Sequence, residues 1–194
     1  MLATPAAEPL DRPGWVFELN YDGLRVLAIR DGRRARLLSR RGYDLSASFP
    51  EIVACLLELP PIVLDGELVM LDAQGKPLFE RLRRRALLKS ETSINNAAHW
   101  EPAVLFVFDV LRVRGRDVRK LSLLKRKDRI QSVVGRALGR FQRVRVLQHA
   151  AEHGQRLFDA ASRLGLEGII AKRADSLYRA GRSRDWLKIS TLQS

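Results

Sequence analysis

Cysteine is almost absent from this chain, and long apolar runs are absent altogether. The one cysteine, Cys55, lies in the apolar stretch IVACLLEL, so we interpret it as a buried helix residue rather than a reactive thiol. This use of cysteine fits a reducing cytoplasm. No apolar run approaches the roughly 20 residues that cross a bilayer. The first residues, MLATPAAEPLDRPG, lack a basic segment followed by an apolar one, so we expect neither a membrane span nor a signal peptide.

Several common ligand-binding patterns are missing too. The sequence has no GxxxxGK phosphate loop, no GxGxxG turn and no CxxC pair, which argues against the nucleotide and metal sites that these motifs build. His149 and His153 are four residues apart, but His149 is placed near a strand end and no third ligand is evident, which argues against a metal site. We place His99, beside Trp100, in a loop.

Positive charge, in contrast, is abundant. Thirty-five lysines and arginines against 22 acidic residues give a net charge of +13. The basic residues cluster at 33–36, 40–41, 81–85 and 125–127. Because each phosphate that a protein neutralises releases counterions, a polyanion is the natural partner of such a surface. The alternative is an arginine-rich proteome whose surface charges simply face solvent.

The apolar pattern predicts a globular fold that mixes strands with helices. Hydrophobic residues make up 46% of the chain, too many for a disordered protein. Strands are predicted at 15–19, 24–29, 35–39, 62–71, 104–113, 144–147, 168–172 and 186–189. Helices are predicted at 50–59, 79–88, 122–138 and 152–164, and the basic stretch 81–96, ending in SETSINN, is interpreted as a mobile surface loop. Without a regular βαβ rhythm, the order favours an α+β fold with antiparallel sheets.

Five short motifs stand in a fixed order along the chain. They are ELNYDGLR at 18–25, SRRG at 39–42, LDGE at 64–67, FVFD at 106–109, and the pair EGIIAK at 167–172 with DWLKIS at 185–190. The text SLYR, at 176–179, precedes the last of them. DGE or EG alone is a weak signal, but the whole set in this order is a specific one.

This ordered set resembles the adenylation domain of ATP-dependent DNA ligases, above all the bacterial end-joining type. The resemblance runs from about Trp15 to Ser190. It implies an α+β nucleotidyltransferase (ATP-grasp-like) core of two antiparallel sheets flanked by helices, over residues 15–190. Residues 1–14 would form an N-terminal extension and 191–194 a tail, with no OB-fold domain present. RNA ligases and capping enzymes share the core motifs, but the text of the last two motifs favours a DNA ligase.

The resemblance also implies a reaction and its partners. In the family a lysine amine attacks the α-phosphate of ATP, with Mg²⁺ as cofactor, and forms a phosphoramidate. AMP then passes to the 5′-phosphate of nicked or broken DNA, and the 3′-hydroxyl displaces it. The partners would be such DNA ends, together with a separate OB-fold or DNA end-binding protein and no membrane. The protein would work in DNA repair and recombination, in the bacterial cytoplasm at the nucleoid.

The resemblance gives each motif residue a role. Glu18 would contact the adenine edge, Phe108 would stack on adenine, and Glu67 would accept a hydrogen bond from the ribose hydroxyl. Arg25 and Arg40 would contact the ribose and phosphate region or the nick phosphate. Lys172 and Lys188 would face the α-phosphate, and Glu167 would position magnesium. Each residue has a plainer structural role as an alternative: core for Phe108, a turn for Glu67, solvated charge for Lys172. Since all of these would have to hold at once, we favour the functional interpretation.

Asn20 departs from the family pattern. It occupies the position of the nucleophilic lysine in KxDG, and its carboxamide nitrogen has no basic lone pair, so it cannot form the phosphoramidate. Its two donors and one acceptor still allow nucleotide binding. Either the lysine was replaced deliberately to trap a nucleotide complex, or this is a natural degenerate ligase domain. A displaced lysine, Lys172 or Lys188, would have to leave its charge role to act instead.

Two further departures concern the last motif. The family closes it with lysine, one residue, lysine, but here Ser190 follows Lys188 and Ile189. The OB-fold that normally comes next has no counterpart in the four residues that remain. The change at Ser190 favours the natural degenerate domain, since one substitution suffices for a trap. The sequence thus supports a ligase adenylation domain that is unable to adenylate itself, or a pseudo-ligase module that only binds nucleotide or DNA ends.

Overall fold

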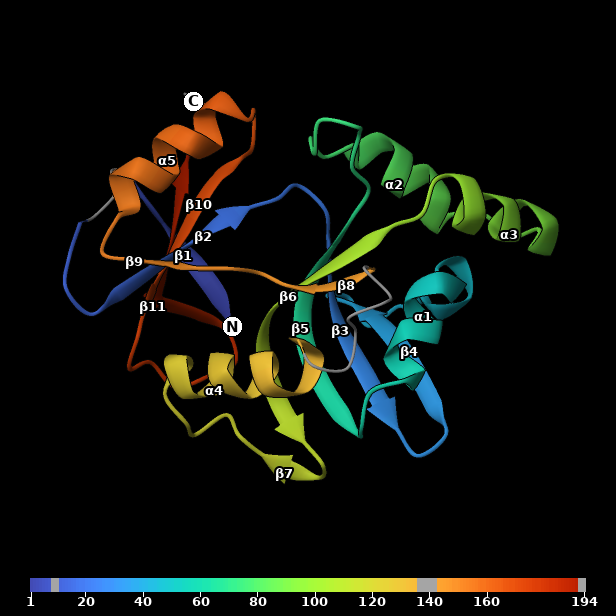
Figure 1. Ribbon diagram of the computed structural model, residues 1–194, viewed down its shortest axis with the longest axis horizontal. Coiled ribbons are helices and arrows are strands. Elements are labelled where there is room, and N and C mark those ends of the chain that lie inside the picture. Colours follow the sequence, from blue (N-terminus) through green and yellow to red (C-terminus); the bar gives the residue numbers. More distant parts are fainter. Residues whose placement is uncertain (8–10, 136–142, 192–194) are drawn as a thin grey trace.

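Two β-sheets lie side by side in the computed structural model, which describes residues 1–7, 11–135 and 143–191 (Figure 1). The first sheet has the strand order β1-β11-β10-β2-β9, and the second β4-β3-β5-β6-β7 with β8 added beside β6. The α+β class and the two-sheet core predicted from the sequence are therefore confirmed. Each sheet contains one parallel pair, β1 with β11 and β6 with β8, so the sheets are mixed rather than wholly antiparallel.

The first sheet brings the two ends of the chain together. Its strands are β1 (Leu2–Ala6), β2 (Trp15–Asn20), β9 (Ala150–Ala151), β10 (Gly168–Arg173) and β11 (Arg182–Ser190). Residues 2–6 lie within the segment predicted to be an N-terminal extension, and they pair in parallel with β11. Opposite residues of antiparallel strands share a face. The pairs Glu18 with Ile170 and Lys172 with Trp186 therefore present their side chains on one face of this sheet.

The second sheet holds most of the core. Its strands are β3 (Leu24–Asp31), β4 (Arg34–Ser39), β5 (Ile62–Val69), β6 (Val104–Val113), β7 (Arg116–Asp117) and β8 (Val144–Val146). The largest apolar cluster packs between this sheet and α1 (Pro50–Leu57), where Cys55 is buried as predicted. Burial raises the pKa of the Cys55 thiol, which keeps it in the unreactive protonated form.

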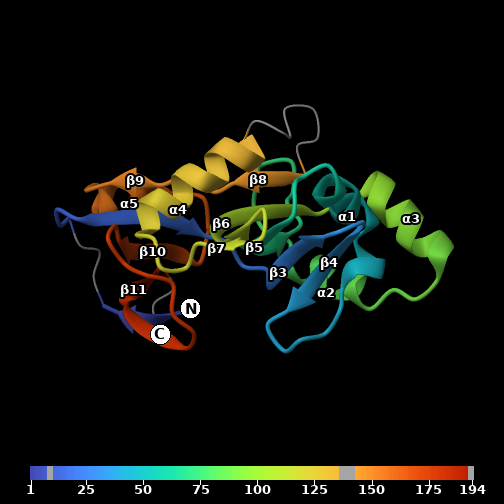
Figure 2. The ribbon, with the colours of Figure 1, turned by 90° about the horizontal axis from the view of Figure 1, so that it is seen from below.

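Helices surround the sheets, and one of them bridges both. α5 (Gly154–Arg163) contacts β2 and β10 of the first sheet, while α2 (Phe79–Ala86) and α3 (Glu91–Trp100) lie at the far side of the second (Figure 1). α4 (Leu123–Ile130) lies between the two halves in both views and continues as a wider π-helical turn, Gln131–Gly135 (Figure 2). The predicted helix 122–138 thus has two segments, and its last residues lie outside the described residues. A short 3-10 turn, Ser46–Ser48, precedes α1.

The predicted surface loop at 81–96 is wrong. Residues 81–86 belong to α2, and α3 begins at Glu91, an acidic residue in its first turn. Negative charge near a helix N-terminus is favourable, and Ile94 is buried on the inner side of this helix. The stretch SETSINN contains a single apolar residue, Ile94, so its helical pattern was too weak to recognise. His99 consequently lies in α3 and not in a loop.

The backbones of the first sheet approach closely at Gly168, the first residue of β10. Gly168 has φ +141°, and a Cβ at this position would lie 2.0 Å from the carbonyl oxygen of Ile189. Only glycine tolerates that approach. Gly168 pairs with both Asn20 and Ser190, so the end of β2 is held tightly against β10.

Within the described part of the chain, no helix is long and apolar enough to cross a membrane.

Candidate nucleotide site

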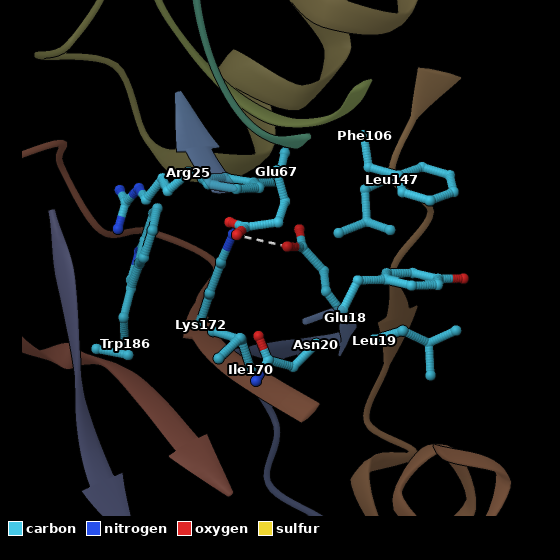
Figure 3. Close-up of a pocket in the computed structure, with 13 residues that line it drawn as sticks. Glu18, Leu19, Asn20, Arg25, Glu67, Phe106, Leu147, Ile170, Lys172 and Trp186 are labelled. Atoms are coloured by element: carbon cyan, nitrogen blue, oxygen red, sulfur yellow. Dashed lines mark hydrogen bonds and ion pairs between the residues drawn. The ribbon is translucent and has the colours of Figure 1, made fainter. Parts of the chain in front are cut away.

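A pocket lies between the two sheets, walled by β2, β10 and β11 on one side and by β3, β5 and β6 on the other (Figure 3). All nine residues predicted for the site line this pocket or the adjoining outer pocket: Glu18, Asn20, Arg25, Arg40, Glu67, Phe108, Glu167, Lys172 and Lys188. Arg40 reaches the outer pocket from the exposed turn after β4. Positions as far apart in sequence as 18 and 188 therefore converge on one groove.

Asn20 lies where the pocket opens outward. Its side-chain Nδ2 donates a hydrogen bond of 2.9 Å to Glu167 Oε2. Lys188 Nζ donates to the same oxygen, also at 2.9 Å. The carboxamide thus holds Glu167 beside an ammonium group, and both donors of this small cluster lie at the mouth of the groove. The Glu167 and Lys188 side chains are 31% and 41% exposed, so this end of the site is open to water.

Glu18 anchors the buried end of the pocket. Its side chain is 1% exposed and forms ion pairs with Lys172, at 2.6 Å, and with Lys127. Burial alone would raise the pKa of the Glu18 carboxyl, but the two ammonium groups hold it below its ordinary value. Burial lowers the pKa of Lys172, and Glu18 offsets part of that effect. Two cations against one carboxylate leave one excess positive charge at this end of the pocket.

Lys127 was not expected in the site. It lies on α4, is 5% exposed, and reaches the Phe108 carbonyl oxygen as well as Glu18. In the sequence it sits inside the basic text KRKDR, which indicates a solvated face. Its neighbour Arg126 is buried too and binds Asp109 with two hydrogen bonds, of 2.7 and 2.9 Å. The spacing of Leu123, Lys127 and Ile130 on one helix face was the signal that could have revealed it.

Aromatic rings surround Lys172. Its Nζ lies 4.4 Å from the centroid of Phe108 and 4.0 Å from that of Trp186, and the two rings meet edge to face at 6.0 Å. An ammonium over an aromatic face is attracted by the ring quadrupole. The Phe108 ring predicted to stack on adenine therefore has a cation on its face in this structure. The stacking role of Phe108 remains a prediction.

A second stacking surface lies farther along the same wall. The rings of Tyr21 and Phe106 are stacked, with centroids 4.6 Å apart and planes 22° from parallel. Both residues line the pocket, with Ile170 across from them and Leu147 beside them. Phe108 was predicted as a residue of the site, and Phe106 was not. Because side chains two residues apart on a strand share a face, Phe106 was recoverable from that alternation.

Arg25 is held by the strand opposite it. Its guanidinium makes two hydrogen bonds to Asp65, of 3.0 and 2.6 Å, and Asp65 also accepts from the Tyr178 hydroxyl at 2.7 Å. Although burial lowers the pKa of Arg25, these bonds raise it above the ordinary value, so the group is always charged. Its carbon centre lies 5.3 Å from the Phe108 centroid. Arg25 therefore presents a fixed positive charge to the pocket.

Glu67 faces the pocket with its negative charge disfavoured. Burial, together with the nearby Asp65, Glu167 and Asp22 carboxylates, raises the pKa of Glu67 to about 8, although Arg25 opposes the shift. At neutral pH this carboxyl is mostly protonated, so it can donate as well as accept a hydrogen bond. Burial and Glu167 likewise raise the pKa of Asp22.

The fit of these carboxylates to a magnesium ion is partial. No group of three or more His, Cys, Asp or Glu side chains in the described residues is arranged to hold a metal. Mg²⁺ bound with a nucleotide needs only one or two protein carboxylates, because the phosphates and water supply its other ligands. Glu167 offers one such carboxylate at the open end of the groove. The donor set therefore fits an ion that arrives with the nucleotide.

The family follows from a comparison of the whole chain with known families. The model for the ATP dependent DNA ligase domain matches residues 1–190. The chain belongs to the ATP-dependent DNA ligase family. Among curated relatives, the multifunctional non-homologous end joining protein LigD of Pseudomonas aeruginosa is 34% identical over 97% of this chain and 21% of the relative. The DNA ligase-like protein LigB of the SPbeta prophage in Bacillus subtilis is 30% identical over 97% of this chain and 66% of that protein.

Solved structures agree with this ligase assignment. The mycobacterial DNA ligase D complexed with ATP and MES superposes with a TM-score of 0.77 at 29% identity, covering 99% of this chain and 60% of the other. The Chlorella virus DNA ligase-adenylate shares the fold, with a TM-score of 0.64 at 18% identity. The chain spans about a fifth to a third of the first curated relatives that it matches. The adenylation domain is thus the part of a ligase that this chain represents.

Proposed function

We propose that this chain is a ligase adenylation domain that binds ATP in the groove but does not adenylate itself, because residue 20 is an asparagine. The observation that carries the proposal is Asn20, whose side chain ends in the groove beside Glu167 and Lys188, among the other motif residues. A carboxamide nitrogen shares its lone pair with the carbonyl, so it cannot attack the α-phosphorus. The groove keeps the cations that bind nucleotide and lacks the amine that reacts with it.

The remaining residues suit binding of a triphosphate. Lys188, Arg25 and Arg40 line the open side of the groove, where charge-assisted hydrogen bonds to phosphate oxygens are strong. Phe106, Phe108 and Ile170 give the deeper end an apolar lining for the base. Glu18 and Lys172 lie at that end, where the adenine edge would lie. When bound, Mg²⁺ would add positive charge at the phosphates, and Glu167 is the residue that would hold it.

Joining of DNA that already carries AMP is the chemical step still open to such a site. If DNA already carries AMP on its 5′-phosphate, the lysine step is not needed. The 3′-hydroxyl then attacks that phosphorus, a new P–O bond forms, and AMP leaves with the bonding electrons. Lys188 and Arg25 would stabilise charge on the phosphoryl oxygens. The substrate would be nicked or broken DNA, positioned by a separate OB-fold or DNA end-binding protein. The site of action would be the bacterial cytoplasm, in DNA repair.

The mass of the protein after incubation with ATP and Mg²⁺ tests the proposal. We expect no mass gain for the chain with Asn20 and a gain of one AMP for Asn20→Lys. Asn20→Met, which extends the side chain without an amine, is the matched control and should also stay unchanged. A gain on the Asn20 chain would identify another nucleophile and overturn the proposal. ATP binding by calorimetry shows whether an unchanged mass reflects an empty groove or a bound, unreacted nucleotide.

A pseudo-ligase that only binds nucleotide or DNA ends is the second candidate. The carboxamide at residue 20 and Ser190 in the last motif favour it, because each removes an amine from the family pattern. Sealing of a pre-adenylated nick separates the two candidates. A transferase releases AMP and joins the strands, whereas a pseudo-ligase binds the nick without joining it. Lys188→Ala should abolish the joining if the groove performs it.

A further inference from the structure

A second hollow lies beyond the nucleotide pocket, beside α2, α3 and β8. We call it the Trp100 groove. It is lined by Leu71, Asp72, Arg81, Trp100, Arg143 and Arg145, among others, and encloses about 1250 Å³ of space open to solvent. No role in the proposed ATP chemistry involves these residues. Its lining joins an exposed aromatic ring to several guanidinium groups, which is the combination that single-stranded nucleic acid uses.

Trp100 is the most exposed large apolar side chain in the described residues, at 77%. It is the last residue of α3, and the neighbouring His99 ring meets it edge to face with centroids 4.6 Å apart. The indole therefore stands at the rim of the groove with its surface open to water. A single exposed apolar side chain is ordinary by itself. Because this indole also lines a hollow with three arginines, it is a candidate stacking surface for a nucleic-acid base.

The charges of the groove favour a phosphate backbone. Arg81 pairs with Glu101 at 2.9 Å, but the two side chains are 59% and 52% exposed. An ion pair this exposed contributes little, so Arg81 can exchange it for a phosphate. Asp72, the other acid of the lining, is engaged locally, because its Oδ1 accepts from the backbone N–H groups of Gln74 and Lys76. Arg143 and Arg145 add positive charge to the lining.

The groove adjoins the nucleotide pocket through a shared strand pair. Arg145 on β8 is paired in register with Phe106 on β6, and Phe106 stacks on Tyr21 inside the nucleotide pocket. Burial raises the pKa of the Tyr21 hydroxyl, and the charge of Arg145 opposes that shift. A strand held at the nucleotide pocket therefore has a basic surface beside it, which leads away toward Trp100.

We propose that the Trp100 groove binds an unpaired strand of nucleic acid, with Trp100 stacked on a base and the arginines at its phosphates. A base inside a duplex is already stacked on both faces, so a protruding indole gains nothing from it. An unpaired base offers a free face. Placing this strand as the overhang of a broken DNA end rests on the proposed function, and it would favour ends with overhangs over intact nicks.

Fluorescence anisotropy with two DNA probes tests the groove. One probe is a single strand of about 12 thymidines, within the site sizes that such proteins cover, and the other is a blunt duplex of the same length. We expect Trp100→Ala to weaken single-strand binding about 10-fold and to leave duplex binding nearly unchanged, as a lost stacking contact predicts. Trp100→Phe should retain most of the affinity because it keeps a stacking face. Intrinsic tryptophan fluorescence should fall only with the single strand.

Charge variants give a matched control. Arg143→Ala should weaken both probes and lower the salt slope of binding by about one. Arg156→Ala, an exposed arginine on α5 across the molecule, should do less to the single strand than Arg143→Ala. Equal losses from Trp100→Ala for single strand and duplex would overturn the proposal, as would no loss for either. Concentration-dependent self-association that Trp100→Ala abolishes would also overturn it, because it would make the groove a protein interface.

Failure of this inference is separable from failure of the proposed function. ATP binding measured by calorimetry should be the same in the chain and in Trp100→Ala, since the indole lies outside the nucleotide pocket. A chain that binds the single strand through Trp100 but binds no ATP would retain the groove and refute the nucleotide site. Binding of ATP with no Trp100-dependent strand binding would do the reverse.

Discussion

The two ends of the nucleotide groove are built differently. At the buried end, Glu18 pairs with two lysines, one of which, Lys172, also lies over two aromatic rings, and almost none of Glu18 touches water. At the open end, Glu167, Lys188 and Asn20 form a small cluster that water reaches. A buried charge left without its partner is costly, whereas an exposed one is readily hydrated. Asn20, where the sequence is predicted to depart from the ligase pattern, lies at the open end.

The largest effect should come from uncharging the buried end. Glu18→Gln leaves Lys127 and Lys172 buried without a carboxylate, and we expect a loss of about 3–5 kcal/mol in the free energy of unfolding. Urea unfolding measures it. The matched change at the open end, Glu167→Gln, should cost less than about 1 kcal/mol because its partner Lys188 is hydrated. Equal losses for the two variants would erase the contrast between the ends.

A pH effect at Glu67 should be next in size. Its folded pKa, about 8, lies above the ordinary value of 4.5. The folded state therefore binds more protons between these values, and stability falls as pH rises through that window, by at most about 1.4 kcal/mol per pH unit. The fall should be gentler than this limit because the side chain is only partly buried. Unfolding of the chain and of Glu67→Gln across pH 5–8 tests it: the variant should lack this slope.

ATP affinity should follow the same titration. Below about pH 8 the neutral Glu67 does not repel the phosphates, and above it the carboxylate does. We expect binding to weaken as pH rises through this value, and Glu67→Gln to bind with little change. Calorimetry on the two proteins measures the difference. Parallel pH profiles would assign the dependence to another group.

Removal of the open-end cation should affect binding rather than folding. Lys188→Ala deletes a charged donor at the open end of the groove, where the phosphates are proposed to bind, and we expect ATP binding to weaken by about 1.5–3 kcal/mol. The thermal midpoint should hardly move, since the Lys188 side chain is 41% exposed. Lys188→Arg should restore part of the affinity. A large loss of stability with unchanged affinity would make Lys188 a structural residue.

Asn20→Ala should have the smallest effect. It removes one hydrogen bond to Glu167, and Lys188 still binds the same oxygen. We expect a loss of about 0.5 kcal/mol in the free energy of unfolding, the low end for one hydrogen bond, measured by urea titration. A loss as large as that of Glu18→Gln would mean that the open end is as tightly built as the buried one.

Much of the fold and of the site was predictable because the ordered motifs lie on strands. Strand alternation puts Glu18 and Asn20 on one face, and the pairing of β2 with β10, and of β10 with β11, brings Lys172 and Lys188 to the same face. Lys127 and Phe106 were missed for different reasons. Lys127 belongs to a basic helix, and its side chain is buried because it pairs with the buried Glu18. Phe106 was missed because it reads as one more apolar residue of a buried strand.

The sequence by itself determined the family and the two-sheet class, and it predicts that residue 20 lacks the reactive amine, because these depend on residue identity and order. Only the tertiary structure decided that Lys127 joins Glu18, that the Lys172 ammonium covers Phe108, and that Trp100 stands at the rim of a basic groove. Each of these depends on groups far apart in the chain. A charge is buried only where folding brings it a partner, and an indole stays exposed only where folding brings nothing to cover it.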